Sequence, residues 1–220
     1  MRYSRVFYKF YASVSEYRVR ALGKVNVMDP AQDLAIREKV GFLGSGNMAQ
    51  AIAEGLIKTG TIPAANIIAS SPSQKSSAKW VGLGAKHTNN NVDVIEQSDV
   101  IFIAVKPHLV DVAINSWRID GSHRAPSKLF ISVVAGTTVE TLEEKLNGIT
   151  LDPRVVRAMT NTPMTVGAGC SVYSGGRKAT QQDLHLVKRL LSAGGICEEV
   201  PQNLINAIGA LAGSGPAFVS

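Results

Sequence analysis

The stretch Val40-Gly-Phe-Leu-Gly-Ser-Gly-Asn-Met-Ala49 decides the fold of this chain. It opens with a short apolar run that ends in glycine, and it leads into a segment, up to Thr59, whose apolar residues recur at helical spacing. A strand, a glycine-rich turn and a helix in this order are typical of a dinucleotide-binding unit. Gly44 permits the tight turn, Gly46 lets the backbone approach a pyrophosphate, and Ala49 keeps the helix close to the sheet. A turn that binds no ligand is the alternative interpretation.

Strand and helix patterns alternate through the rest of the chain. Two continuous apolar runs, 100–105 and 129–134, predict strands that are covered on both faces of a sheet. Weaker patterns predict strands at 67–69, 85–87, 154–159, 169–174 and, at an edge, 196–200, and helices at 48–59, 73–81, 92–96, 138–146, 183–192 and from 202, with a pause at 213–216. The alternation predicts an α/β fold over residues 39–200, with a doubly wound, Rossmann-type and mostly parallel sheet.

The residues that end the second predicted strand bear on the choice of cofactor. Chains that bind NADH usually carry a carboxylate there, which accepts a hydrogen bond from the ribose 2′-hydroxyl. This chain has Ala69-Ser-Ser-Pro72 instead, with Lys75 nearby. Because no carboxylate would repel a 2′-phosphate, and hydroxyls and a lysine could receive it, we expect NADPH, with NADH as the alternative. An ordinary polar turn is the interpretation without a ligand.

Three more loops follow predicted strands and fall on the same edge of the sheet. They are Ala104-Val-Lys-Pro107, Ala135-Gly136 and Met159-Thr-Asn-Thr-Pro163. In an open α/β sheet, ligands bind outside the carboxyl ends of the strands. Lys106 is therefore placed to meet a phosphate, a ribose or a substrate carboxylate, although a solvated loop lysine is the alternative. The small residues of the second loop leave room for a nicotinamide.

The positive charge of the chain is concentrated near its amino terminus. The 220 residues have a net charge of +6, and residues 1–28 hold six basic residues against one acidic residue, a balance of +5. The rest of the chain is thus close to neutral and has no basic stripe interleaved with aromatic residues, so we expect no nucleic-acid partner. With 45% apolar residues, the chain can build one well-buried domain and some additional structure.

Residues 1–38 differ in character from the rest. Aromatic and apolar residues recur there at helical spacing, and basic residues fall largely on another face. Such a basic, acid-poor start is typical of a mitochondrial transit peptide, and an unstructured extension or a wrongly assigned start is the alternative. Asp29-Pro30 would end a helix, and the residues up to Glu38 read as a linker. We expect a cytoplasmic or mitochondrial location.

Metal, disulfide and membrane chemistry find no support in the sequence. The four histidines are scattered, and the two cysteines, Cys170 and Cys197, have no metal-binding spacing. We therefore expect no metal site and two reduced thiols in the interior. No apolar run approaches the roughly 20 residues that span a bilayer, so we expect no membrane partner.

Taken in order, these motifs resemble those of the pyrroline-5-carboxylate reductases. The stretch that opened this section is followed by Ser70-Ser-Pro72, Ser98-Asp99, Ala104-Val-Lys-Pro-His108, Arg157-Ala-Met-Thr-Asn-Thr-Pro163 and Gly213-Ser-Gly-Pro-Ala217. The last two are the more specific, because many reductases share the glycine fingerprint. The resemblance runs from about Lys39 to Ser220.

The resemblance implies an NAD(P)H-dependent oxidoreductase that acts on a small imine. The family reduces 1-pyrroline-5-carboxylate to L-proline, the last step of proline biosynthesis. A protonated imine is already electrophilic, so hydride transfer needs mainly positioning and a donor to the ring nitrogen. No strong acid–base pair is required, and we assign no catalytic residue.

The resemblance also implies where the cofactor binds. The loop after the first strand would hold the pyrophosphate, Ser71 the 2′-phosphate region, and Asn91 another part of the cofactor, while the loops after the next two buried strands would line the nicotinamide half. The full expected set is Leu43, Gly44, Ser45, Gly46, Asn47, Met48, Ser71, Asn91, Ala104, Val105, Lys106, Pro107, Val134, Ala135 and Gly136.

Members of the family continue beyond the last motif with helices that build a homodimer and contact the substrate. Residues 201–220 are therefore expected to be the start of an all-α dimerisation and substrate domain, truncated in this chain. Two other functions stay open. The chain could be an NADPH-binding module without turnover, or a β-hydroxyacid-type reductase, for which Lys188 is the only candidate catalytic lysine and lies on a helix that comes too early.

Overall fold

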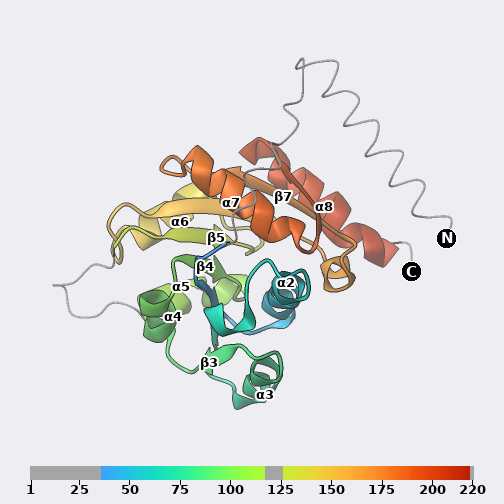
Figure 1. Cartoon of the computed structure of the whole chain (residues 1–220). Coiled ribbons are helices and arrows are strands. Elements are labelled where there is room, and N and C mark those ends of the chain that lie inside the picture. The colour runs from blue at the N-terminus through green and yellow to red at the C-terminus, as the bar shows by residue number, and fades with distance from the viewer. Residues whose placement is uncertain (1–35, 117–125, 219–220) are drawn as a thin grey trace. The chain divides into compact units, whose positions relative to one another are not determined.

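The computed structural model describes residues 36–116 and 126–218, except for the side chains of residues 74, 75 and 213–218 (Figure 1). Residues 1–35 lie outside this part, so the targeting segment expected there stays a prediction. Ile36 already packs against the core with 6% of its surface exposed. The described fold thus begins within the expected linker, shortly before the first strand.

One eight-stranded sheet forms the centre of the described residues. Its order is β3-β2-β1-β4-β5-β6-β7-β8, with β1 at Val40–Leu43, β2 at Ile67–Ser70, β3 at Lys86–Thr88, β4 at Val100–Ile103, β5 at Leu129–Ser132, β6 at Arg154–Met159, β7 at Gly169–Gly175 and β8 at Gly195–Glu199. The strands from β3 to β6 are parallel, β7 runs antiparallel to β6, and β8 is parallel to β7. The expected doubly wound, mostly parallel sheet is confirmed, with β8 at an edge.

Helices cover both faces of this sheet, as Figure 1 shows. One apolar cluster joins the strands to α2 (Asn47–Lys58), α3 (Gln74–Gly82) and α7 (Gln181–Ser192). A second joins the opposite face to α4 (Asn91–Gln97), α5 (Val110–Asn115) and α6 (Val139–Leu146). Because β1, β4 and β5 contribute to both clusters, every residue in them is buried, which explains why their sequences are apolar except at Ser132.

The helix ends follow the capping preferences of their residues. Thr138 accepts a hydrogen bond from the backbone of Thr141 at the start of α6. Thr180 and Asp183 form a reciprocal capping box at the start of α7, which satisfies two backbone donors. The helix α2 is different, because no side chain caps its amino terminus at Gly46.

The last helix, α8, departs from the sequence prediction. We expected a pause at 213–216, but α8 runs without interruption from Gln202 to Phe218. Pro216 lies inside it and has no N–H to donate to the carbonyl four residues earlier. That carbonyl, of Ala212, accepts instead from the side-chain amide of Asn161 at 3.1 Å. The fold supplies from another element the hydrogen bond that proline removes.

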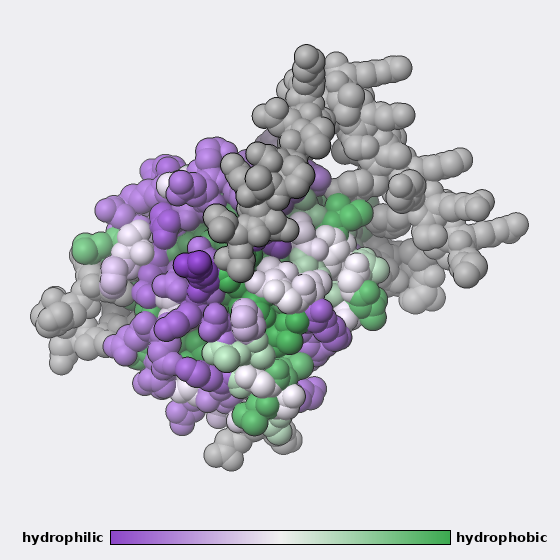
Figure 2. Space-filling model, viewed as in Figure 1, coloured by the Kyte–Doolittle hydropathy of each residue, from purple (hydrophilic) through white to green (hydrophobic). Residues whose placement is uncertain are grey.

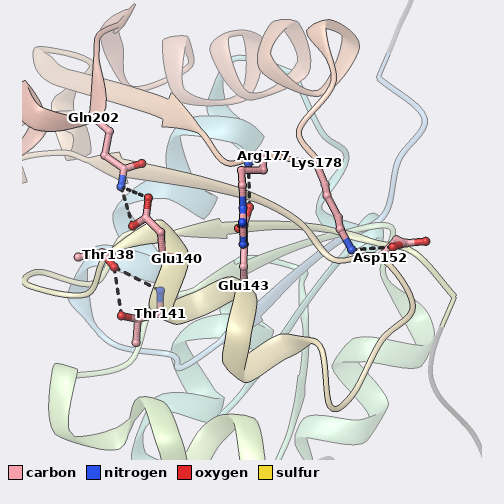
Figure 3. Close-up of polar contacts among 8 residues, drawn as sticks. All are labelled: Thr138, Glu140, Thr141, Glu143, Asp152, Arg177, Lys178 and Gln202. Carbon is pink, nitrogen blue, oxygen red and sulfur yellow. Dashed lines mark hydrogen bonds and ion pairs between the residues drawn. The ribbon is translucent and has the colours of Figure 1, made fainter.

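Polar contacts join α6 to the segment before α7 and to α8 (Figure 3). Buried Glu143 accepts from the backbone N–H and the Nε of Arg177 at 2.8 and 3.1 Å. At the surface, Gln202 of α8 donates to both carboxylate oxygens of Glu140 at 3.0 and 2.9 Å. The buried carboxylate matters most for stability, because exposed polar pairs contribute little.

The surface is mixed in character. On the face seen in Figure 2, hydrophilic residues predominate and hydrophobic residues form patches between them, as is normal for a folded domain. None of the helices within 36–116 and 126–218 is both long and apolar enough to cross a membrane. Three short 3₁₀ segments, Ala64–Asn66, Pro107–Leu109 and Thr162–Val166, complete the described elements.

Candidate functional site

The carboxyl ends of the central strands are held together by backbone hydrogen bonds that continue past the strands. Gly44 donates to Ser70 at 3.0 Å, Ala104 donates to Leu43 at 2.9 Å, and Val133 donates to Ile103 at 3.1 Å. The loops after β1, β4 and β5 therefore leave the sheet side by side. This arrangement brings together three of the sequence-predicted groups, namely the glycine loop, 104–107 and 134–136.

The two glycines of the first loop have different structural reasons. Gly44 has φ +97°, and a Cβ there would lie 2.7 Å from the carbonyl oxygen of Ala104. The turn therefore demands glycine. Gly46 is exposed with an ordinary φ of −72°, and a Cβ there would meet no atom within 4 Å. The space above Gly46 is thus open to a ligand that packs against the backbone.

The loop is anchored from beneath through Ser45, which is 3% exposed. Its carbonyl oxygen accepts from the side-chain amide of Gln50 at 2.8 Å and from the indole of Trp80 at 3.3 Å. Trp80 is fully buried on α3 and packs on Phe42 with ring centroids 5.4 Å apart. With this carbonyl turned inward, the loop backbone is fixed before any ligand arrives.

The amino terminus of α2 offers unpaired donors beside this loop. The first helical hydrogen bond runs from Gln50 to the carbonyl of Gly46, and no acidic residue lies in the first turn. Helix amino termini carry free N–H groups and a partial positive charge, which together favour phosphate. The open backbone at Gly46 and the uncapped helix fit a pyrophosphate.

At the end of β2, two serines contact neighbouring elements. Ser70 is buried and donates to the side-chain oxygen of Asn91 at 2.5 Å. Ser71 lies partly exposed, donates to the carbonyl of Ser73 at 3.2 Å and lies 3.3 Å from Nε2 of His87. No carboxylate belongs to this group, as the sequence indicated, so its chemistry suits a phosphate.

Asn91 does not present a free amide. Its oxygen accepts from Ser70, and its nitrogen donates to the hydroxyl of Ser116 at 2.8 Å and to the carbonyl of Ala113 at 3.3 Å. These bonds fasten α4 to the end of β2 and to α5. A direct contact of this side chain with a cofactor stays a prediction, and the structure gives Asn91 a positioning role.

The other sequence-predicted residues divide into backbone and side-chain groups. Leu43 and Val134 are core residues with at most 1% exposure, so only their backbones can meet a ligand. Lys106, Pro107, Ala135 and Gly136 are exposed, and Gly136 has φ +78° with open space around it. The remaining members of the set, Asn47, Met48, Ala104 and Val105, lie on the same edge and are exposed or half-buried.

Sequence reasoning missed three residues that shape this region: Trp80, His87 and Arg157. Arg157 on β6 is 2% exposed and donates to the side-chain oxygen of Asn206 on α8 at 2.7 Å. Burial lowers the pKa of its guanidinium, which nearby Glu140 opposes. An arginine between the apolar residues Val156 and Ala158 of this strand was the available signal.

Of the two cysteines expected in the interior, Cys197 is buried and Cys170 is half-buried. Cys170 and Cys197 are free thiols, and burial raises the pKa of Cys197 to about 12. Within the described ranges, no group of three or more His, Cys, Asp or Glu could hold a metal ion. His123 lies outside those ranges.

Comparison with known proteins now gives this geometry a context. Residues 39–136 match the family described as NADP oxidoreductase, coenzyme F420-dependent. Over 181 residues the chain is 39% identical to pyrroline-5-carboxylate reductase 2 of Rattus norvegicus, covering 81% of this chain and 56% of that protein. The chain belongs to the pyrroline-5-carboxylate reductase family, over the amino-terminal part of its members. It spans about half the length of these relatives.

Solved structures of the family agree in fold. The pyrroline-5-carboxylate reductase of Coxiella burnetii is 30% identical with a TM-score of 0.74, over 83% of this chain and 66% of that one. The pyrroline carboxylate reductase of Plasmodium falciparum, solved with NADP bound, is 28% identical with a TM-score of 0.71, over 83% and 65%. The family is thus one of oxidoreductases built on an NADP-binding Rossmann fold.

Proposed function

We propose that this chain binds NADPH at the carboxyl edge of its sheet and that the protein reduces the imine of 1-pyrroline-5-carboxylate to L-proline. The observation that carries the proposal is the open backbone at Gly46 beside the uncapped start of α2. Membership of the family supports the substrate, and the NADP in a related structure supports the cofactor.

Different loops at the carboxyl edge of the sheet would bind different groups of the cofactor. The loop from Leu43 to Met48 would hold the pyrophosphate, because the first N–H groups of α2 have no helical acceptor and the carbonyl of Ser45 points away. Ser71 would receive the 2′-phosphate. Bound NADPH supplies the hydride.

The loops after β4 and β5 would line the nicotinamide half. Ala135 and Gly136 are small and exposed, so a flat ring can lie against them. Lys106 is exposed with its charge available for a phosphate, a ribose or a substrate carboxylate. The chemistry needs no strong acid–base pair, since a protonated imine accepts hydride once it is correctly placed.

A second candidate function is NADPH binding without turnover. The chain spans 56% of the length of the rat relative, and the described residues place only one long helix, α8, after the sheet. The residues expected to bind the cofactor all lie between positions 43 and 136, before α8 begins. Two observations argue against the β-hydroxyacid-type alternative. Lys188 lies on α7, a helix within the sheet domain, and its amine is paired with the carboxylate of Glu198 at 3.6 Å.

Two measurements on this chain separate these candidates. NADPH binding is followed by the fluorescence of the reduced nicotinamide, and turnover by its oxidation in the presence of pyrroline-5-carboxylate. Binding with turnover supports the reductase, and binding without turnover supports the binding module. No NADPH binding would overturn both.

A glycine variant tests where NADPH binds. Gly46→Val fills space that no protein atom occupies, so the fold should persist while NADPH affinity falls about tenfold or more, equivalent to 1.4 kcal/mol. Gly82→Val, at the far end of α3 and equally free of neighbours, is the matched control. Unchanged affinity in Gly46→Val would contradict the pyrophosphate assignment.

A further inference from the structure

A histidine lies beside Ser71, the first residue after β2, at a position that the site residues expected from sequence do not include. His87 lies on β3, whose register with β2 pairs it with Ala69. A backbone bond from Ser71 to Thr88 of 3.1 Å ties the ends of the two strands. The imidazole is therefore held next to Ser71 by the sheet itself.

Both side chains of this contact can donate. The hydroxyl of Ser71 donates to the carbonyl of Ser73 at 3.2 Å and lies 3.3 Å from Nε2 of His87, where the donor depends on the tautomer of the ring. With Nε2 protonated, Ser71 and His87 each hold a donor that can turn toward an anion between them.

Among the side chains that the structure describes, Ser71 is the hydrogen-bond partner of the imidazole. The ionisable residues on the elements packed against β3, and on β3 itself, are Lys75, Lys79, Lys86, Asp93 and Glu96. Asp93 is already bound, since it accepts from Thr88 at 2.5 Å and from Asn90 at 3.4 Å. Partial burial is the cause that lowers the pKa of His87, so the ring is mostly neutral at pH 7.

We propose that His87, together with Ser71, recognises the 2′-phosphate of NADP(H) and makes the preference for NADP(H) over NAD(H) depend on pH. The inference rests on the proposed function, because it requires a dinucleotide at this edge. A phosphate dianion beside the ring would favour the imidazolium and raise its pKa. Binding of the phosphorylated cofactor then takes up a proton, so it strengthens as the pH falls through the pKa of the bound state.

The test compares His87→Gln with the wild-type chain. The dissociation constants of NADP⁺ and NAD⁺ are measured between pH 5.5 and 8 by calorimetry, and the ratio of the NAD⁺ constant to the NADP⁺ constant cancels effects on the shared part of the cofactor. Dividing the wild-type ratio by that of His87→Gln also removes the titration of the phosphate itself, whose pKa is about 6. His185→Gln, an exposed histidine on α7, is the matched control.

We expect this quotient to rise up to about tenfold from pH 8 to pH 5.5, for a shift of one pKa unit, with no such rise for His185→Gln. An NMR titration of the wild-type histidines gives an independent measure, in which NADP⁺, and not NAD⁺, raises the pKa of His87. If the quotient does not change with pH, or if the pKa of His87 is the same with both dinucleotides, the proposed role of His87 is overturned. The proposed function is not affected by that result. If neither dinucleotide binds, the proposed function itself is overturned.

Discussion

The two glycines of the loop after β1, Gly44 and Gly46, lie in different surroundings. Gly44 is required by its left-handed conformation and by the carbonyl of Ala104 against it, whereas Gly46 borders open space. The motif predicted the tight turn for Gly44 and the close approach of a pyrophosphate for Gly46. The structure shows why the turn requires glycine at position 44, whereas the role of Gly46 in binding stays a prediction.

Stability measurements should show this difference. Gly44→Ala should lower the free energy of unfolding by about 2 to 4 kcal/mol, from backbone strain and overlap with Ala104. Gly46→Ala should change it by less than about 0.5 kcal/mol. Urea denaturation followed by circular dichroism measures both, and equal stabilities would contradict the distinction.

Cys197 should make the fold sensitive to alkali. Burial raises its pKa to about 12 in the fold, from an ordinary value of 9.0. The folded state keeps the proton that the unfolded state loses, so this contribution is complete below pH 9 and is lost between pH 9 and 12, at about 1.4 kcal/mol per pH unit.

Cys197→Ala should therefore flatten the fall in stability above pH 9, measured by urea denaturation at several pH values. An exposed-residue variant such as Lys58→Ala should keep the wild-type slope, since Lys58 forms only an exposed pair with Glu54. An unchanged slope in Cys197→Ala would show that other groups dominate alkaline unfolding.

At the level of elements, the sequence predicted the strands and long helices well, because their apolar residues follow the burial that the sheet imposes. β4 and β5 are shorter than expected. They end at Ile103 and Ser132, because the chain already turns into the loops 104–107 and 134–136 there. The short helix α5 was not predicted. α3 gave a weak signal because Trp80 is its one fully buried side chain among those described.

The candidate site was predictable only in part, for a physical reason. Glycines and the absence of a carboxylate after β2 can be recognised along the chain. His87 becomes relevant only through the register of β3 with β2, and Trp80 only through a hydrogen bond across 35 positions. The contribution of such residues to the site cannot be recognised from the sequence, because it depends on segments that only the folded sheet brings together.

The attachment of α8 to the sheet can be tested through Asn206. Asn206→Ala should leave the buried guanidinium of Arg157 without this acceptor and cost about 1 to 3 kcal/mol, whereas Asn206→Asp should retain the attachment. Hydrogen exchange of the α8 amides measures the effect, with exposed Asn203→Ala as control. Equal exchange in Asn206→Ala and Asn203→Ala would rule out the anchor.

For the whole molecule, cofactor binding should stabilise the fold. NADPH at one hundred times its dissociation constant should add about 2.7 kcal/mol, which raises the melting temperature by about 5 to 10 °C for a chain of this size. Scanning fluorimetry measures the shift, and Gly46→Val should abolish it. The same shift in Gly46→Val would place the ligand elsewhere.

The bond from Asn161 to the carbonyl of Ala212 has a consequence for how this sequence can change over generations. It joins positions 51 apart, in the loop after β6 and in the helix that contains Pro216. Loss of the proline would let the helix satisfy its own carbonyl and leave the amide without that acceptor. Loss of the asparagine would leave the carbonyl unsatisfied. Asn161 and Pro216 should therefore be kept or lost together when related sequences are compared.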